Sequence, residues 1–291
     1  MGQRVMQWRG RRTSRNIEDR RQAGGGRRRG GGGRLGIGAT LIVLLVGAYF
    51  GVDVSSFVDG TGLSTSQTTS VQRGPNAIDD DQEALVATVL AETEQVWSGL
   101  FQASELSYDE TVLVLYSGGT TSGCGAAQSA MGPFYCPGDR RVYLDTDFFR
   151  VMEQQLQAGG DFANAYVIAH EVAHHVQNLL GTLSQVHNQR ARVSEVAGNG
   201  LLVRLELQAD CYAGIWAHHA RDSLQVTDAD IREALRTAAR IGDDAIQRAA
   251  GRSVVPDSFT HGTSAQRQHW FFAGYSNGDP QACDTFAAGA L

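Results

Sequence analysis

The residues with the clearest chemical potential lie between positions 170 and 174, where the sequence is His-Glu-Val-Ala-His. Two histidines four residues apart lie on one face of a helix, close enough for both imidazoles to bind one metal ion. The acid after the first histidine, Glu171, lies beside that ion without binding it and can accept a proton from water. Neutral imidazole is a good zinc ligand, and zinc with an open coordination position activates water near neutral pH. The motif predicts a zinc site with His170 and His174 as ligands and Glu171 as general base.

A third ligand must come from another part of the chain. The extended pattern HExxHxxGxxH is absent, because Gln177 and Leu180 occupy the positions of its glycine and third histidine. Glu206 lies thirty-two residues after His174 in a predicted helix, and Asp210 follows on the same helix face. Glu206 can therefore bind the metal while Asp210 accepts the other ring N–H of a ligand histidine and fixes its tautomer. Other residues could also supply the third ligand, namely Glu195, His187 and His218.

Peptide hydrolysis also needs a hydrogen-bond donor for the oxyanion of the tetrahedral intermediate. We expect His261 to fill this role, because it lies in a loop rich in Thr, Gly and Ser after the predicted helices. The alternatives are Tyr135, Tyr212 and His269. His175 is rotated about 100° around the helix from its neighbour His174, so we expect it to face away from the metal.

Hydrophobic periodicity predicts the elements that position these residues. The predicted helices span Asp79–Phe101, Asp161–Leu180 (with Asp161 as N-cap and Gly181 just past the end), Leu201–Ala220 and Asp228–Ala249, and the predicted strands span Thr111–Tyr116 and Arg141–Asp145. We expect an α+β domain that is mostly helical with a small sheet. The polar flanks of Arg141–Asp145 suggest an edge strand, which could bind an extended peptide by strand addition.

Charge is distributed very unevenly along the sequence. Residues 1–34 contain eleven arginines and two acids, a net charge of +9, whereas the remaining residues contain fourteen arginines and 29 acids, a net charge of −15. Residues 35–52 carry no charge, and as a helix they would span about 27 Å, close to the roughly 30 Å hydrocarbon core of a bilayer. Arginines before this stretch and acids after it predict a single-pass anchor with the N-terminus in the cytoplasm. A cleaved signal peptide is the alternative.

These features divide the chain into four parts. Residues 1–34, with runs of Gly and Arg, are predicted to be a disordered cytoplasmic leader, and residues 35–52 a transmembrane anchor. Residues 53–77 have the composition of a flexible linker, and residues 78–291 form the folded domain, on the extracytoplasmic side. The basic leader is better explained by its position next to the membrane than by nucleic acid, so no nucleic-acid partner is expected.

All four cysteines follow the apolar stretch, and none lies in a CxxC pair. An even number of cysteines in an exported domain suggests two disulfides, for which three connectivities are possible. Pairing of Cys124 with Cys136 would close a Gly-rich loop, and pairing of Cys211 with Cys283 would tie the C-terminal tail to a helix. Four buried thiols are the alternative.

HExxH with a downstream ExxxD resembles the gluzincin class of metallopeptidases, and the chain is more closely similar to the bacterial, membrane-anchored family of neutral zinc metallopeptidases. The similarity runs nearly end to end, except for the linker and the last few residues, and rests on the leader Arg11–Arg21, the anchor, Gly123–Gly125, Gly132–Pro137, the HEVAHHVQ helix, Glu206–Gly214 and Phe259–Ser264. It implies a zincin-like fold, one Zn²⁺ per chain, and hydrolysis of a protein or peptide substrate. A catalytically silent, zinc-stabilised scaffold at the membrane is the alternative function.

Overall fold

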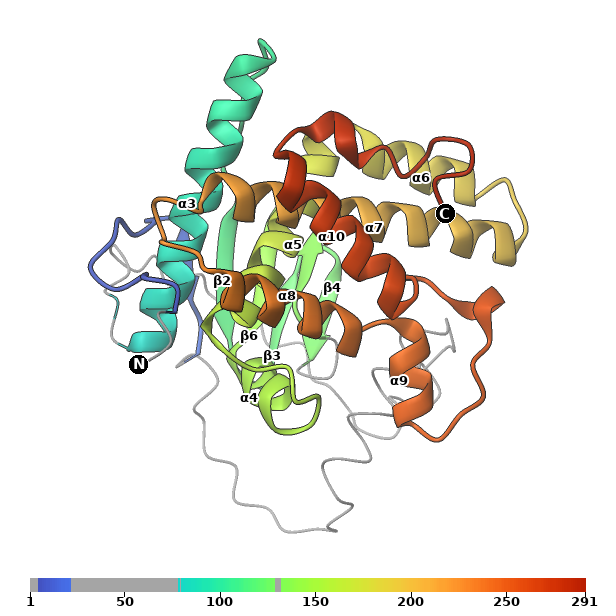
Figure 1. Ribbon diagram of the computed structural model, residues 1–291, viewed down its shortest axis with the longest axis horizontal. Coiled ribbons are helices and arrows are strands. Elements are labelled where there is room, and N and C mark those ends of the chain that lie inside the picture. The colour runs from blue at the N-terminus through green and yellow to red at the C-terminus, as the bar shows by residue number, and fades with distance from the viewer. Residues whose placement is uncertain (1–4, 22–77, 79, 129–131) are drawn as a thin grey trace.

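The computed structural model describes residues 5–21, 78, 80–128 and 132–291 (Figure 1). The predicted α+β class is confirmed: a small mixed sheet lies against a larger set of helices. Within these ranges no helix has the length and apolar character needed to cross a bilayer. The predicted anchor at residues 35–52 and linker at residues 53–77 lie outside the described residues.

The main sheet has the strand order β1-β2-β6-β5. Its strands are β1 Ile17–Asp19, β2 Val112–Tyr116, β6 Arg141–Asp145 and β5 Phe134–Cys136. β1, β2 and β6 are parallel, and β5 pairs antiparallel with β6. The predicted strand at Arg141–Asp145 exists, but the prediction that it is an edge strand is wrong. Its polar ends reflect the ends of a buried strand, and the edge strand on this side of the sheet is β5, so strand addition at β6 is blocked.

The central helix of the fold is α5, Asp161–Leu179, which carries the HExxH sequence. It contacts β5 and β6, and also the helices α3 (Asp81–Ala103), α6 (Thr182–Arg190), α7 (Glu195–His219) and α8 (Asp228–Arg240). The helix ends where predicted, since Gly181 adopts the left-handed conformation at φ 80°. Asp161 is not the N-cap, however; Gly160 is, and the Asp161 carboxylate accepts a hydrogen bond from the Trp8 indole at 2.7 Å.

α7 packs against α10, Ser264–Asn277, along much of its length (Figure 1). Two glycines permit the close approach. A Cβ atom on Gly214 would lie 2.0 Å from the Phe271 carbonyl oxygen, and one on Gly274 would lie 1.9 Å from the Cys211 carbonyl oxygen. Backbone therefore meets backbone at this crossing, and neither position has room for a side chain.

The single helix predicted for Asp228–Ala249 is instead two helices, α8 and α9, the latter spanning Asp243–Ala249. The break falls at Gly242, where a Cβ atom would lie 2.4 Å from the backbone nitrogen of Ser264. The turn is therefore set by the approach of the α10 N-terminus, which hydrophobic periodicity does not report. The other elements are β3 (Gly119–Ser122), β4 (Gly125–Gln128), α4 (Thr146–Gln154), η2 (Pro256–Ser258) and η3 (Pro280–Cys283).

The prediction that residues 1–34 form a disordered leader is wrong for residues 5–21. This N-terminal segment packs on the domain beside α3, shown in blue in Figure 1. Met6, Trp8 and Ile17 are at most 7% exposed and belong to the main hydrophobic core. Composition averaged over the leader hid these three apolar side chains among the arginines. The folded unit therefore begins well before Ile78.

The four cysteines pair in sequence order and form two disulfides, Cys124–Cys136 and Cys211–Cys283. The first joins the loop after β3 to the edge strand β5. The second fastens the C-terminal η3 turn to α7 at Cys211, five residues after Glu206.

Candidate metal centre

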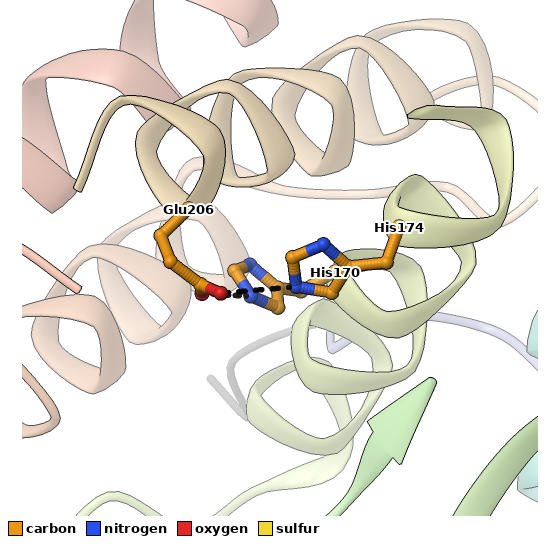
Figure 2. A group of neighbouring side chains, drawn as sticks. All are labelled: His170, His174 and Glu206. Atoms are coloured by element: carbon orange, nitrogen blue, oxygen red, sulfur yellow. Dashed lines mark hydrogen bonds and ion pairs between the residues drawn. The ribbon is translucent and has the colours of Figure 1, made fainter. Parts of the chain in front are cut away.

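Three of the predicted residues converge on one point between α5 and α7. Figure 2 shows the imidazoles of His170 and His174 pointing from α5 toward the carboxylate of Glu206 on α7. The Nε2 atoms of the two histidines lie 3.1 Å and 3.5 Å from the Glu206 carboxylate oxygens. One ligand atom from each residue lies within 4.8 Å of the other two, and within the described residues no other group of three or more such side chains does so. The predicted ligand set is thus the one that the fold assembles.

The outer nitrogens of both imidazoles are already engaged. His170 Nδ1 donates to the Asp210 carboxylate at 2.9 Å, as predicted from the helix register. His174 Nδ1 donates to the Gln177 side-chain oxygen at 2.9 Å, and Gln177 is held by the hydrogen bond from its amide nitrogen to the Leu205 carbonyl. Both Nε2 lone pairs are therefore left to face the Glu206 carboxylate. Two such imidazoles and one carboxylate form a donor set that fits one Zn²⁺ with a position left open.

A buried cation holds Asp210 in place. Arg267 of α10 donates from Nε and Nη2 to the two Asp210 oxygens at 2.8 Å and 2.9 Å, and both side chains are almost fully buried. The Tyr166 hydroxyl donates to the same carboxylate. Burial alone would raise the pKa of Asp210, but Arg267 and His170 outweigh it and lower that pKa to about 2. Asp210 is therefore a fixed anion behind His170.

The electrostatics of the ligands favour a cation between them. Burial opposes protonation of His170, but Asp210 and Glu206 outweigh burial and raise its pKa to about 10. Burial works against ionisation of Glu206, yet the imidazoles of His261 and His174 hold its pKa well below the ordinary value. A bound metal would replace the proton that these anions now attract to His170.

Glu171 lies in the same helical turn, buried at 8% exposure. Among the described residues its carboxylate has no hydrogen-bonding partner, and burial raises the pKa of Glu171 above the ordinary value against the opposing effect of His174. It lines the same cleft as the three ligands but does not belong to their cluster. This is the position expected of a general base that does not bind the metal.

His261 lies at the edge of the centre, with its Nε2 atom 3.8 Å from Glu206. Its loop is fixed by Asp243 at the start of α9, whose buried Oδ2 accepts backbone N–H groups of three consecutive residues, 260 to 262. Burial lowers the pKa of His261, so the neutral ring is favoured. The structure thus brings the predicted oxyanion donor to the metal-binding residues.

The centre opens into a cleft of about 710 Å³. One wall includes Gly132, Pro133, Phe134 and Tyr135 on and before the edge strand β5, and the apolar side chains along the cleft include Phe148, Leu156, Leu183, Leu202, Leu205, Ile241 and Ile246. Glu195 and Arg190 also line it. Among the described strands β5 is the edge of its sheet on this side, and an edge strand beside a metal centre suits a substrate in extended conformation.

The remaining sequence candidates lie elsewhere or have other partners. Glu195 lines the cleft, but it is exposed and does not belong to the metal cluster. His187 and His218 are also exposed and lie outside both the cleft lining and the cluster. Tyr212 and His269 do not line the cleft. Tyr135 does, but its hydroxyl accepts from Asn178 and bonds the His175 ring. His175 faces away from the metal-binding residues, as predicted. It is buried, and its Nε2 donates to the Asp109 carbonyl at 2.6 Å.

Sequence reasoning missed four residues of the centre: Tyr166, Gln177, Asp243 and Arg267. A signal existed for Arg267, because it is a charged residue one helical turn before the buried, aromatic pair Trp270 and Phe271. A charge so placed needs a buried partner. Nothing local identifies that partner as Asp210, which lies 57 positions earlier.

A helix with HExxH, a second helix with the third ligand and a small sheet alongside are consistent with a zincin-like domain. A family model described as "Putative neutral zinc metallopeptidase" matches residues 6–286, and the chain belongs to that family. Uncharacterized protein YpfJ of Escherichia coli K12 is 47% identical over 289 residues, covering 97% of this chain and 99% of that protein. Uncharacterized protein Mb2605 of Mycobacterium bovis is 46% identical over 209 residues, 68% of each chain. No solved structure matches the chain.

Proposed function

We propose that this protein is a zinc-dependent peptidase that hydrolyses peptide bonds in a protein or peptide substrate. The observation that carries the proposal is the position of Glu171. An unpaired, buried carboxylate lies beside a two-histidine, one-glutamate metal centre that opens into a cleft of about 710 Å³. A purely structural metal site is closed and has no use for an unpaired base next to it.

The chain's own residues divide the reaction between them. Zinc held by His170, His174 and Glu206 would supply a Lewis acid for the scissile carbonyl and for the attacking water. Glu171 accepts the proton of the attacking water and returns it to the leaving amine. The His261 Nε2–H group donates a hydrogen bond to the oxygen of the tetrahedral intermediate. We place the substrate in extended form along the free edge of β5, in place of the β6 position expected from the sequence.

We further propose that the catalytic domain acts on the extracytoplasmic side of the membrane. Two disulfides support this location, because such bonds persist in oxidising compartments. Attachment to the membrane through residues 35–52 stays a prediction from the sequence, since those residues lie outside the described part.

The test compares Glu171→Gln with Glu195→Gln in the full chain. Both variants remove a carboxylate that lines the cleft, but only Glu171 lies beside the metal ligands. We expect Glu171→Gln to keep its zinc and lose about 10²–10⁴-fold in cleavage rate on a denatured protein mixture, whereas Glu195→Gln stays within a few fold. Loss of zinc from Glu171→Gln would make this residue a ligand. Unchanged biological function of Glu171→Gln would favour the scaffold over the peptidase.

A further inference from the structure

The N-terminal segment, residues 5–21, is joined to the catalytic domain through all of its length. From these contacts we infer that the N-terminal segment and residues 78–291 form one folded unit and lie on the same side of the membrane. The inference does not depend on peptidase activity. It replaces the expectation that the leader lies in the cytoplasm while the domain lies outside.

Backbone pairing is the first link. β1 lies parallel to β2 with Ile17 opposite Leu113 and Asp19 opposite Leu115, and it occupies the outer edge of the sheet. Hydrogen bonds continue beyond the strand, from the Leu113 N–H to the Asn16 carbonyl and from the Arg20 N–H to the Leu115 carbonyl. Without the segment, a buried central strand would become an open edge with unpaired backbone groups.

The first residues of the segment contact the N-terminus of α5 and the region around α8. The Trp8 indole is 4% exposed and donates to Asp161 at the N-terminus of the metal-binding helix. The Met6 N–H donates to Asp230, whose carboxylate also caps α8, and the Gln7 N–H donates to the Leu224 carbonyl. The segment therefore spans from the sheet to α8 and touches the helix that carries both histidine ligands.

The arginines of the segment have acidic partners. Four of its six arginines form ion pairs: Arg9 with Asp81, Arg12 with Glu94, Arg20 with Glu18 and Arg21 with Asp19, Asp80 and Glu83. Glu83 is fully buried, and Arg21 reaches it at 2.8 Å. The buried Glu94 accepts from Ser14 and Asn16. A buried carboxylate needs such partners, so the domain acids and the leader arginines complement each other.

The same contacts reach a wall of the cleft. The Asn16 side chain donates to Glu110, and the neighbouring Asp109 carbonyl accepts from His175. The Nδ1 atom of that imidazole is then free to accept from the Tyr135 hydroxyl on β5. The N-terminal segment thus supports the loop that holds the edge strand beside the metal centre.

This packing constrains the topology of the membrane protein predicted from the sequence. A single crossing by the chain between Arg21 and Ile78 would put a hydrocarbon layer of roughly 30 Å between two parts that share one sheet and one core. Residues 5–21 and residues 78–291 are therefore expected on one side of the bilayer. Four of the eleven arginines that suggested a cytoplasmic N-terminus form ion pairs within the fold.

Cysteine labelling in the full-length, membrane-bound protein tests the inference. Thr13 in the segment and Gln102 on α3 are both exposed, so each can be changed to cysteine without removing a buried contact. Sealed membranes of known orientation are treated with a membrane-impermeant maleimide before and after detergent. We expect Thr13→Cys and Gln102→Cys to react to the same extent before detergent. Reaction of only one of them until detergent is added would overturn the inference.

The labelling outcomes also separate this inference from the location proposed above. Equal labelling from the outside supports both. Equal protection from the outside supports the single unit but places the catalytic domain in the cytoplasm.

As a second measurement, a site-specific protease sequence is inserted between residues 22 and 77 of the full chain and cut in detergent. The N-terminal fragment should remain bound through gel filtration, and its quantitative loss would contradict the single unit.

Discussion

At the scale of residues, the orientation of His170 depends on the balance of charge behind it. His170, Asp210 and Arg267 form a chain of hydrogen bonds behind the place where His170 would bind zinc, and the Asp210 carboxylate accepts from both neighbours. The arginine binds both oxygens of the carboxylate, which fixes the direction of the acceptor as well as its charge. Orientation of the imidazole, and with it the metal affinity, should therefore depend on a residue that never touches the metal.

Changing Arg267 to lysine tests this dependence. Lysine keeps the positive charge but cannot bind both carboxylate oxygens in a fixed plane. We expect the zinc affinity to fall by about 10–100-fold, because supporting hydrogen bonds tune metal sites by that amount. Arg248→Lys is the control, since Arg248 pairs with Asp244 at the surface. Competition with a fluorescent zinc chelator measures both affinities, and equal values would remove Arg267 from the centre.

At the scale of elements, the crossing of α7 and α10 decides where Arg267 and Asp210 meet. The two helices approach until backbone touches backbone at Gly214 and Gly274. This approach brings a side chain of α10 within hydrogen-bonding distance of the ligand-bearing helix. Larger residues at the crossing would push α10 outward and withdraw Arg267 from its partner.

Gly214→Ala and Gly200→Ala form a matched pair in the same helix. A Cβ atom at Gly214 would lie 2.0 Å from the Phe271 carbonyl oxygen, whereas one at Gly200 would meet no atom within 4 Å. We expect Gly214→Ala to lower the free energy of unfolding by about 1–3 kcal/mol or more through overpacking. Gly200→Ala should raise it by about 0.5–1 kcal/mol, because alanine is the better helix former. Urea denaturation measures both, and a Gly214→Ala protein as stable as Gly200→Ala would contradict the close crossing.

For the whole molecule, a bound metal would cross-link α5 and α7 through His170, His174 and Glu206. The hydrophobic core holds the same two helices, the Cys211–Cys283 disulfide fastens α7 to η3, and the N-terminal segment contacts α5 through Trp8. The chain should therefore stay folded without zinc but be less stable. This differs from a small zinc finger, which unfolds when its metal is removed.

Chelation of zinc from the purified full chain should lower its thermal midpoint without abolishing the cooperative transition. The loss is about 2.7 kcal/mol if free zinc stood at 100 times its dissociation constant. Glu206→Ala lacks one ligand, so its midpoint should not respond to chelator or to added zinc. Differential scanning fluorimetry measures the shift, and identical responses of the two proteins would place the metal elsewhere.

The sequence by itself determined what depends on local spacing. The i, i+4 placement of His170 and His174, and of Glu206 and Asp210, follows from helix geometry, so ligands and their support could be predicted once two amphipathic helices were recognised. The same periodicity located α3, α5 and α7. The sequence left three cysteine connectivities open, and the fold reduces them to one.

Only the tertiary structure decided which distant groups meet. Nothing near Arg267 in the sequence specifies Asp210 as its partner. The polar ends of β6 do not show that β5 pairs with its outer side. The arginine-rich leader does not show that it contacts the buried acids Glu83 and Glu94. Helical periodicity is encoded within a few residues, whereas strand pairing and the neutralisation of buried charge are satisfied by partners tens to hundreds of positions away. For that reason the metal ligands of this protein could be predicted from its residues, and the place of its N-terminal segment could not.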